Sequence, residues 1–130
     1  MATHYVIIGG GPAATNALET LRACDAEGQI TLVCDEPAHS RMALPYWLSQ
    51  QIAREHTLTA DAAYFSKLKV DARIGNRVTR IDPAASKLQL DDGDSLAFDK
   101  LLIATGSSPA SRIDSSVSSR IGRAILSAPA

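Results

Sequence analysis

Residues 5–14 read YVIIGGGPAA and join a short apolar stretch, a glycine cluster and the start of a helix. The spacing G-x-G-x-x-A runs from Gly9 through Gly11 to Ala14, as in the first turn of a dinucleotide-binding unit. Gly9 tolerates a tight turn, Gly11 lets the backbone approach a pyrophosphate, and Ala14 lets the helix pack closely on its strand. An ordinary glycine turn is the alternative, but the flanking strand and helix favour a dinucleotide site.

The helix that follows the glycines is predicted over residues 12–26, with Pro12 in the first turn, where a missing N–H costs nothing. Its apolar residues recur at helical spacing, and its unpaired first N–H groups favour a bound phosphate. Residues 30–34, ITLVC, predict a second, mostly apolar strand. Strand, helix and strand within about 30 residues indicate a parallel βαβ unit.

The pattern changes beyond this unit. We expect helices over 42–54 and 61–67 and a strand over 70–74. Short alternating strands follow over 77–81, 87–90 and 96–98, with a hairpin signal at Asp92-Gly93, and an apolar strand is predicted over 101–104. This antiparallel insertion disfavours an NAD-dependent dehydrogenase, whose strands and helices keep alternating. Residues 121–126 predict at most a weak terminal helix.

Composition narrows the class of protein. The chain has 130 residues, 45% of them hydrophobic, and a formal net charge of -1. This balance predicts no nucleic-acid partner and no membrane surface. The apolar stretch before Gly9 is too short for a signal segment or a membrane span, so we expect a cytoplasmic protein. Cys24 and Cys34 have the spacing of neither a metal site nor a disulfide framework.

Two carboxylates follow the second predicted strand. Asp35 and Glu36 lie slightly beyond the spacing of about 20 residues at which an acidic residue binds the ribose hydroxyls. Carboxylates there repel a 2′-phosphate, which favours FAD or NAD over NADP. The alternative is a solvated acidic turn before Pro37, and the residues do not decide which carboxylate dominates.

Four segments, VIIGGGPAA, LVCDEP, SRMALP and LLIATGSSP, occur in an order that resembles the FAD-dependent pyridine nucleotide oxidoreductases. This family includes ferredoxin reductases, NADH oxidases and apoptosis-inducing factor. The resemblance implies an α/β fold, a three-layer Rossmann-like FAD-binding domain whose central parallel sheet carries an antiparallel β-meander insertion, incomplete at the C-terminus. We expect this domain over residues 1–109 and a Ser/Arg-containing tail, poorly ordered or a linker, over 110–130.

The resemblance also assigns a site, residue by residue. It places the pyrophosphate on the glycine turn and helix start, the ribose on the acidic pair, the adenine edge on the backbone of one hairpin residue, and the flavin over the ATG motif. The pyrophosphate residues are Gly9, Gly10, Gly11, Pro12, Ala13 and Ala14, and the acidic pair is Asp35 and Glu36. The hairpin residue is Val78, and the ATG motif is Ala104, Thr105 and Gly106. The resemblance further implies that Arg41 lies along the cofactor.

The reaction is implied only for a longer relative. Met42 stands where one branch of the family has a single redox cysteine, so we expect no catalytic residue here. The scattered positions of His4, His39 and His56 predict no metal site. Family members continue into an NAD(P)-binding domain, in which NAD(P)H is the co-substrate. The expected function is FAD binding as the N-terminal part of an NAD(P)H oxidoreductase that passes hydride to FAD and electrons to a small acceptor. The alternative is a non-catalytic FAD- or adenine-nucleotide-binding module that needs a partner chain or a homo-oligomer.

Overall fold

A five-stranded sheet forms the centre of the computed structural model, which describes residues 2–107 and the backbone of 124–127. The strand order is β3-β2-β1-β7-β8, and all neighbours are parallel except β7 and β8. The strands are β1 (His4–Ile8), β2 (Gln29–Cys34), β3 (Val70–Ile74), β7 (Lys100–Ile103) and β8 (Ala124–Ser127). The predicted central parallel sheet is therefore confirmed.

The register brings the ends of the central strands together. Ile8, the last residue of β1, lies opposite Val33 of β2 and Ile103 of β7. The loops after these three strands consequently leave from the same edge of the sheet. This is the edge at which open α/β sheets bind ligands.

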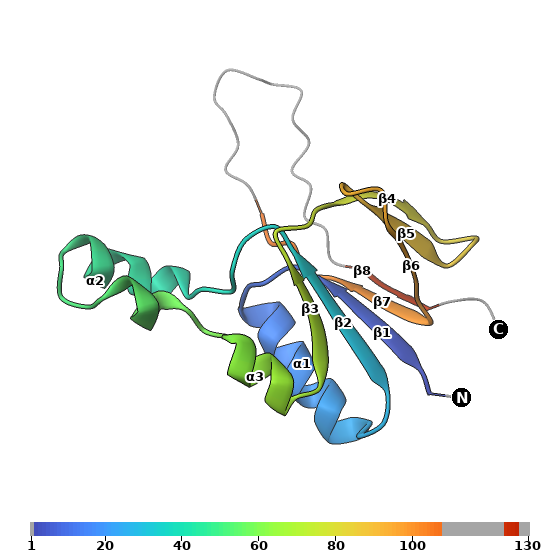
Figure 1. Cartoon of the computed structure of the whole chain (residues 1–130), viewed down its shortest axis with the longest axis horizontal. Helices are drawn as coiled ribbons and strands as arrows, with labels where there is room; N and C mark the ends of the chain where they lie inside the picture. Colours follow the sequence, from blue (N-terminus) through green and yellow to red (C-terminus); the bar gives the residue numbers. More distant parts are fainter. Residues whose placement is uncertain (1, 108–123, 128–130) are drawn as a thin grey trace, which may run out of the picture.

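Two helices cover one face of the sheet, α1 (Pro12–Cys24) and α3 (Ala62–Lys67) (Figure 1). Ala14 and Leu18 of α1 are fully buried and share a core with Ile7 and Leu32 of the sheet. Asp61 caps α3, accepting a hydrogen bond of 2.8 Å from the backbone N–H of Tyr64. Both helices begin about where the sequence predicts.

The opposite face carries an antiparallel meander of three strands, β4 (Val78–Asp82), β5 (Lys87–Leu90) and β6 (Ser95–Ala97). Because side chains alternate along a strand, Val6 and Ile8 point away from α1 and join Leu88 and Leu90 of the meander in a second core. Meander, sheet and helices form the three layers that the family resemblance implies (Figure 1).

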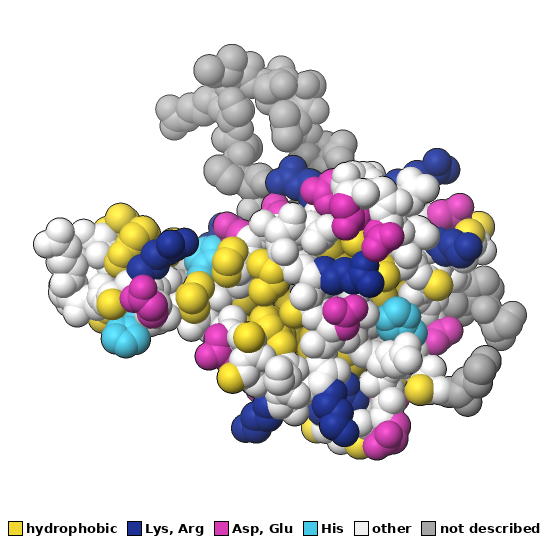
Figure 2. Space-filling model, in the orientation of Figure 1, with side chains coloured by type: hydrophobic (Ala, Val, Ile, Leu, Met, Phe, Trp, Pro, Cys, Tyr) yellow, Lys and Arg dark blue, Asp and Glu magenta, His cyan; other side chains and the backbone are white. Residues whose placement is uncertain are grey.

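The prediction of one helix over 42–54 is wrong. The segment forms the 3₁₀ turn η1 (Arg41–Ala43), the short helix α2 (Leu44–Leu48) and a second 3₁₀ turn, η2 (Arg54–Thr57), in an arm that projects from the domain (Figure 1). Apolar side chains lie on the surface of this arm (Figure 2), with Met42 86% and Leu48 74% exposed. Without a sheet to pack against, the helical pattern lacks the contacts that sustain long helices.

The prediction of a weak terminal helix over 121–126 is also wrong for residues 124–126, which the structure describes. Residues 124–127 form β8, which pairs with β7 from Ala124 opposite Ile103 to Ser127 opposite Lys100. The exposed backbone of an edge strand favours such pairing. Residues 108–123 and 128–130 lie outside the described residues, so the linker prediction for the tail stays a prediction.

Arg22 joins the end of α1 to the turn before β3. Its Nε donates a hydrogen bond of 2.7 Å to the carbonyl of Leu68, and Nη2 reaches the carbonyl of Lys69 at 3.1 Å. Nη1 lies 2.9–3.1 Å from the carbonyl oxygens of Asp25, Ala26 and Gly28. The planar guanidinium of Arg22 therefore hydrogen-bonds to carbonyl groups of two loops. The ammonium group of a lysine cannot reproduce this arrangement.

We expect Arg22→Lys to lower the free energy of unfolding by about 1–3 kcal/mol, because charge-assisted hydrogen bonds to several carbonyls are lost. Urea denaturation followed by circular dichroism measures this. Arg80→Lys, an exposed site on β4, is the matched control, with an expected change within about 0.5 kcal/mol. Equal stability of the two variants would contradict the assigned role of Arg22.

Candidate cofactor-binding site

A cavity of about 1380 Å³ opens at the edge of the sheet where β1, β2 and β7 end. The glycine turn, the loop after β2, the start of the arm, the β3–β4 connection and the segment after β7 all contribute to its wall. Every predicted site residue except Ala14 lines it, namely Gly9, Gly10, Gly11, Pro12, Ala13, Asp35, Glu36, Arg41, Val78, Ala104, Thr105 and Gly106. Predicted site residues up to 97 positions apart in sequence (Gly9 and Gly106) are thereby brought together.

Ala14 lies in the core and not in the cavity. It is 0% exposed and packs in the cluster that contains Ile7 and Leu18. Its small side chain serves close packing of α1 on the sheet, the role that the glycine pattern predicts for it. The side chain of Ala14 thus lies behind the cavity wall, and its place in the predicted cofactor site stays a prediction.

Gly9 occupies a position that excludes any side chain. Its φ of +126° is disfavoured for other residues, and a Cβ built there would overlap the carbonyl oxygen of Ala104. The N–H of Gly9 donates to the carbonyl of Val33 at 2.8 Å, and the N–H of Ala104 donates to Ile8 at 2.8 Å. These contacts join the turn to β2 and to the end of β7.

Gly11 presents the opposite situation. It is the N-cap of α1, no side chain caps the helix there, and a Cβ at Gly11 would meet no atom within 4 Å. Because Gly11, Pro12 and Ala13 all line the cavity, the first turn of a 13-residue helix faces that space. Unpaired N–H groups and the partial positive charge of the helix start suit a pyrophosphate there.

The acidic pair follows β2 and lies at the surface of the cavity. Asp35 Oδ2 is 2.9 Å from Nη2 of Arg77, and Glu36 Oε1 is 4.0 Å from Nδ1 of His39. The side chains of Asp35 and Glu36 are 54% and 58% exposed. Both carboxylates are thus accessible, and that of Asp35 is already paired with the guanidinium of Arg77.

Sequence reasoning missed several lining residues, above all Arg77, together with Asn76, His39 and Cys34. The sequence feature that could have identified Arg77 is its position directly before Val78, the residue whose backbone is assigned to the adenine edge. Its contact with Asp35 spans 42 residues of sequence and follows from no local pattern.

Cys34 is buried beside the glycine turn. Burial raises the pKa of its thiol, and the negative charges of Asp35 and Glu36 add to the shift. The thiol is therefore held in its neutral form at neutral pH, although the thiolate is the reactive species. Cys34 fills space next to Gly10.

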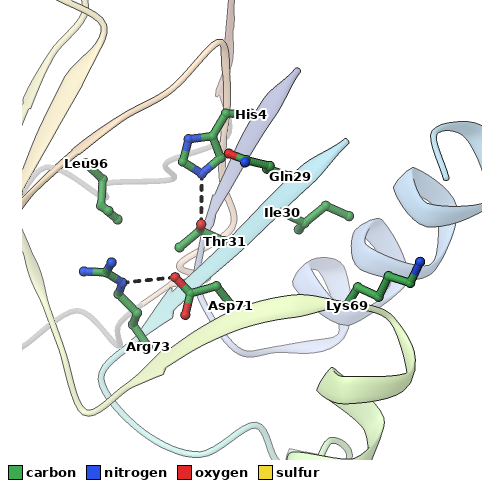
Figure 3. A pocket seen from close by; sticks show the side chains of 8 residues that line it. All are labelled: His4, Gln29, Ile30, Thr31, Lys69, Asp71, Arg73 and Leu96. Atoms are coloured by element: carbon green, nitrogen blue, oxygen red, sulfur yellow. Dashed lines mark hydrogen bonds and ion pairs between the residues drawn. The ribbon is translucent and has the colours of Figure 1, made fainter. Parts of the chain in front are cut away.

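A second cavity, of about 350 Å³, lies near the start of β1 and the edge strand β3 (Figure 3). Its polar groups engage one another: Nε2 of His4 lies 2.9 Å from Oγ1 of Thr31, and Nε of Arg73 lies 3.4 Å from Oδ2 of Asp71. It contains none of the predicted site residues. Among the described residues, no group of three or more metal-ligating side chains is present, and no helix is long and apolar enough to cross a membrane.

Comparison with known proteins agrees with this geometry. The family described as "Pyridine nucleotide-disulphide oxidoreductase" matches residues 3–118. The ferredoxin--NAD(+) reductase component of an anthranilate 1,2-dioxygenase system from Burkholderia cepacia is 35% identical over 113 residues. The ferredoxin reductase component of a chlorobenzene dioxygenase from Cupriavidus sp. (strain PS12) is 38% identical over 114 residues.

Each of these two alignments covers 82% of this chain and 27% of the relative, so the chain spans about a quarter of the length of such proteins. Among solved structures, the putidaredoxin reductase–putidaredoxin covalent complex aligns with a TM-score of 0.79 and 28% identity, covering 90% of this chain and 29% of that one. Fold, site and sequence therefore agree, and the chain belongs to the pyridine nucleotide-disulphide oxidoreductase family, a family of FAD-binding enzymes that use NAD(P)H as co-substrate.

Proposed function

We propose that this chain binds FAD in the 1380 Å³ cavity and supplies the FAD-binding portion of an NAD(P)H oxidoreductase. The glycine turn is the observation that carries the proposal. Gly9 is fixed against Ala104 with no room for a side chain, while Gly11 faces open space at the start of α1. The glycine turn and the start of α1 together thus leave room for a phosphate in the space that a side chain would otherwise fill.

Each part of the cavity wall then has a defined task. The backbone from Gly9 to Ala13 would hold the pyrophosphate, and Asp35 or Glu36 would accept the ribose hydroxyls. Arg41, exposed at the start of the arm, can offset phosphate charge. The backbone of Val78 would meet the adenine edge, and Ala104 with Thr105 and Gly106 would lie beneath the cofactor.

The bound flavin supplies hydride and electron transfer. The chain's own residues bind and orient it, and no side chain of the cavity is assigned a proton-transfer role. The named relatives are ferredoxin reductase components, so we propose that the whole protein passes electrons from NAD(P)H to a small redox protein. This activity belongs to a protein about four times as long as the aligned segment.

The alternative proposal is a non-catalytic module that a second chain or a second copy completes. The exposed apolar side chains of the arm favour it, since Met42, Tyr46 and Leu48 are each more than half exposed. Turnover of NADH with a dye acceptor by this chain alone would exclude this alternative.

Titration of the purified chain with FAD tests the first proposal. The folded chain is expected to bind FAD stoichiometrically and to change the visible absorption and the fluorescence of the flavin. A chain that is folded by circular dichroism and leaves both signals unchanged would contradict FAD binding.

Gly11→Asp separates binding from folding. Aspartate is a favourable N-cap residue and the site has open space, so the variant is expected to melt at the same or a higher temperature. Its charge would meet the pyrophosphate, and we expect FAD to bind at least about tenfold more weakly.

Gly11→Asn is the matched control because it caps the helix without a charge, and it should lose less affinity than Gly11→Asp. Calorimetric titration measures both affinities. Unchanged FAD affinity in Gly11→Asp would place the pyrophosphate elsewhere.

The acidic pair is expected to discriminate against a 2′-phosphate. Wild-type protein should bind AMP more tightly than adenosine 2′,5′-bisphosphate, which differs from AMP only in the 2′-phosphate. Asp35→Asn combined with Glu36→Gln should reduce this preference by about tenfold, because the repelling carboxylates become neutral. The two single variants show which carboxylate contributes more. A preference that survives in the double variant would overturn the ribose assignment.

A further inference from the structure

The cavity wall offers few flat surfaces for a purine ring. Among the described residues that line it there is no Phe, Tyr or Trp. The planar side chains that could lie flat against a base are the imidazole of His39, the amide of Asn76 and the guanidinium groups of Arg41 and Arg77, and Arg41 is already assigned to the phosphate charge. An adenine base that enters this cavity therefore meets glycine backbone, aliphatic groups and these four polar planes.

Arg77 is held at a defined position on the β3–β4 connection. Its backbone N–H donates to Oδ1 of Asp91 at 3.0 Å, and its carbonyl accepts from the N–H of Asp91 at 2.8 Å. Its side chain is 72% exposed, and Nη2 lies 2.9 Å from Oδ2 of Asp35, which also lines the cavity. The backbone is thus fixed by hydrogen bonds, while most of the side-chain surface stays accessible.

The direction of the Arg77 side chain is informative. The carboxylate of Asp91 already contacts the backbone of Arg77, yet the guanidinium reaches across to the end of β2. An exposed ion pair contributes little to stability. The ion pair with Asp35 therefore positions the guanidinium of Arg77 and adds little to the stability of the fold.

We propose that Arg77 is the adenine-recognition residue of this site, with its guanidinium stacked against the purine and held in place by Asp35. The inference rests on the proposed FAD function and assigns a side chain to adenine, where the family resemblance offers only the backbone of Val78. Guanidinium groups stack on aromatic rings, and an ammonium group lacks the planar surface to do so. Asp35 Oδ2 holds the arginine and Oδ1 stays available to a ribose hydroxyl.

His39 is the weaker candidate. Its side chain is 20% exposed, and Nδ1 lies 3.0 Å from the carbonyl oxygen of Pro37 and 4.0 Å from Glu36. The ring is thus tied to its own loop. Asn76 is engaged in the same way, since its Nδ2 donates to Oδ2 of Asp92 at 2.7 Å.

Calorimetric titration of Arg77→Lys with ADP and UDP tests the proposal, since both ligands contain ribose and pyrophosphate and differ in the base. Lysine keeps the positive charge and removes the planar surface. We expect ADP to bind about five- to thirtyfold more weakly, as for loss of a stacked cation, and UDP to change less than about threefold. Arg80→Lys on β4 is the matched control, and both affinities should equal those of the wild type.

The outcomes separate the two proposals. Equal losses for ADP and UDP, or no loss for ADP, would overturn adenine recognition by Arg77 while leaving the cofactor site intact. A wild-type chain that binds neither FAD nor ADP would instead overturn the proposed function. Thermal melting of both variants, expected at the wild-type temperature, confirms that binding and not folding is measured.

Discussion

The close approach of Gly9 to the carbonyl of Ala104 is the constraint on which the site depends. Parallel pairing of β1 with both neighbours brings three strand ends to one edge of the sheet. At that edge the chain must turn from β1 into α1 within the space that the end of β7 leaves free, and a residue with a Cβ does not fit. The turn, the helix start and the segment after β7 therefore form one cradle.

Two separate cores support this cradle from opposite faces of the sheet. One packs α1 and α3 against the sheet, and the other packs the meander against it. Neither core requires the charged residues of the cavity, which lie at its surface. Binding residues such as Asp35 and Arg77 can thus be replaced with little expected cost in stability, so binding and folding are separable by substitution.

Much of the fold could be predicted because its signals are local. The glycine spacing, the apolar strand around Leu32 and the Asp92-Gly93 turn are determined by neighbouring residues, and the structure has them where the sequence predicts. The arm and β8 could not be predicted in this way. Apolar periodicity over 42–54 suggests a helix, but no described surface packs against it there, and β8 exists through pairing with β7.

The candidate site shows the same division. The glycine turn followed from a local pattern, and Val78 and the segment 104–106 followed from the family resemblance. The ion pair between Arg77 and Asp35 depends instead on how β4 leaves the end of β3, which only the folded chain shows. Ala14 marks the converse case. The glycine pattern predicts that its small side chain lets α1 pack closely on the sheet, and its side chain lies in that core.

An NMR titration of the ¹⁵N-labelled chain with ADP tests the central claim most directly. If a pyrophosphate lies at the start of α1, the backbone amide signals of Gly10, Gly11 and Ala13 should shift most, while those of Thr31 and Arg73 in the smaller cavity stay in place. Largest shifts in the smaller cavity, or shifts spread evenly over the chain, would contradict the account.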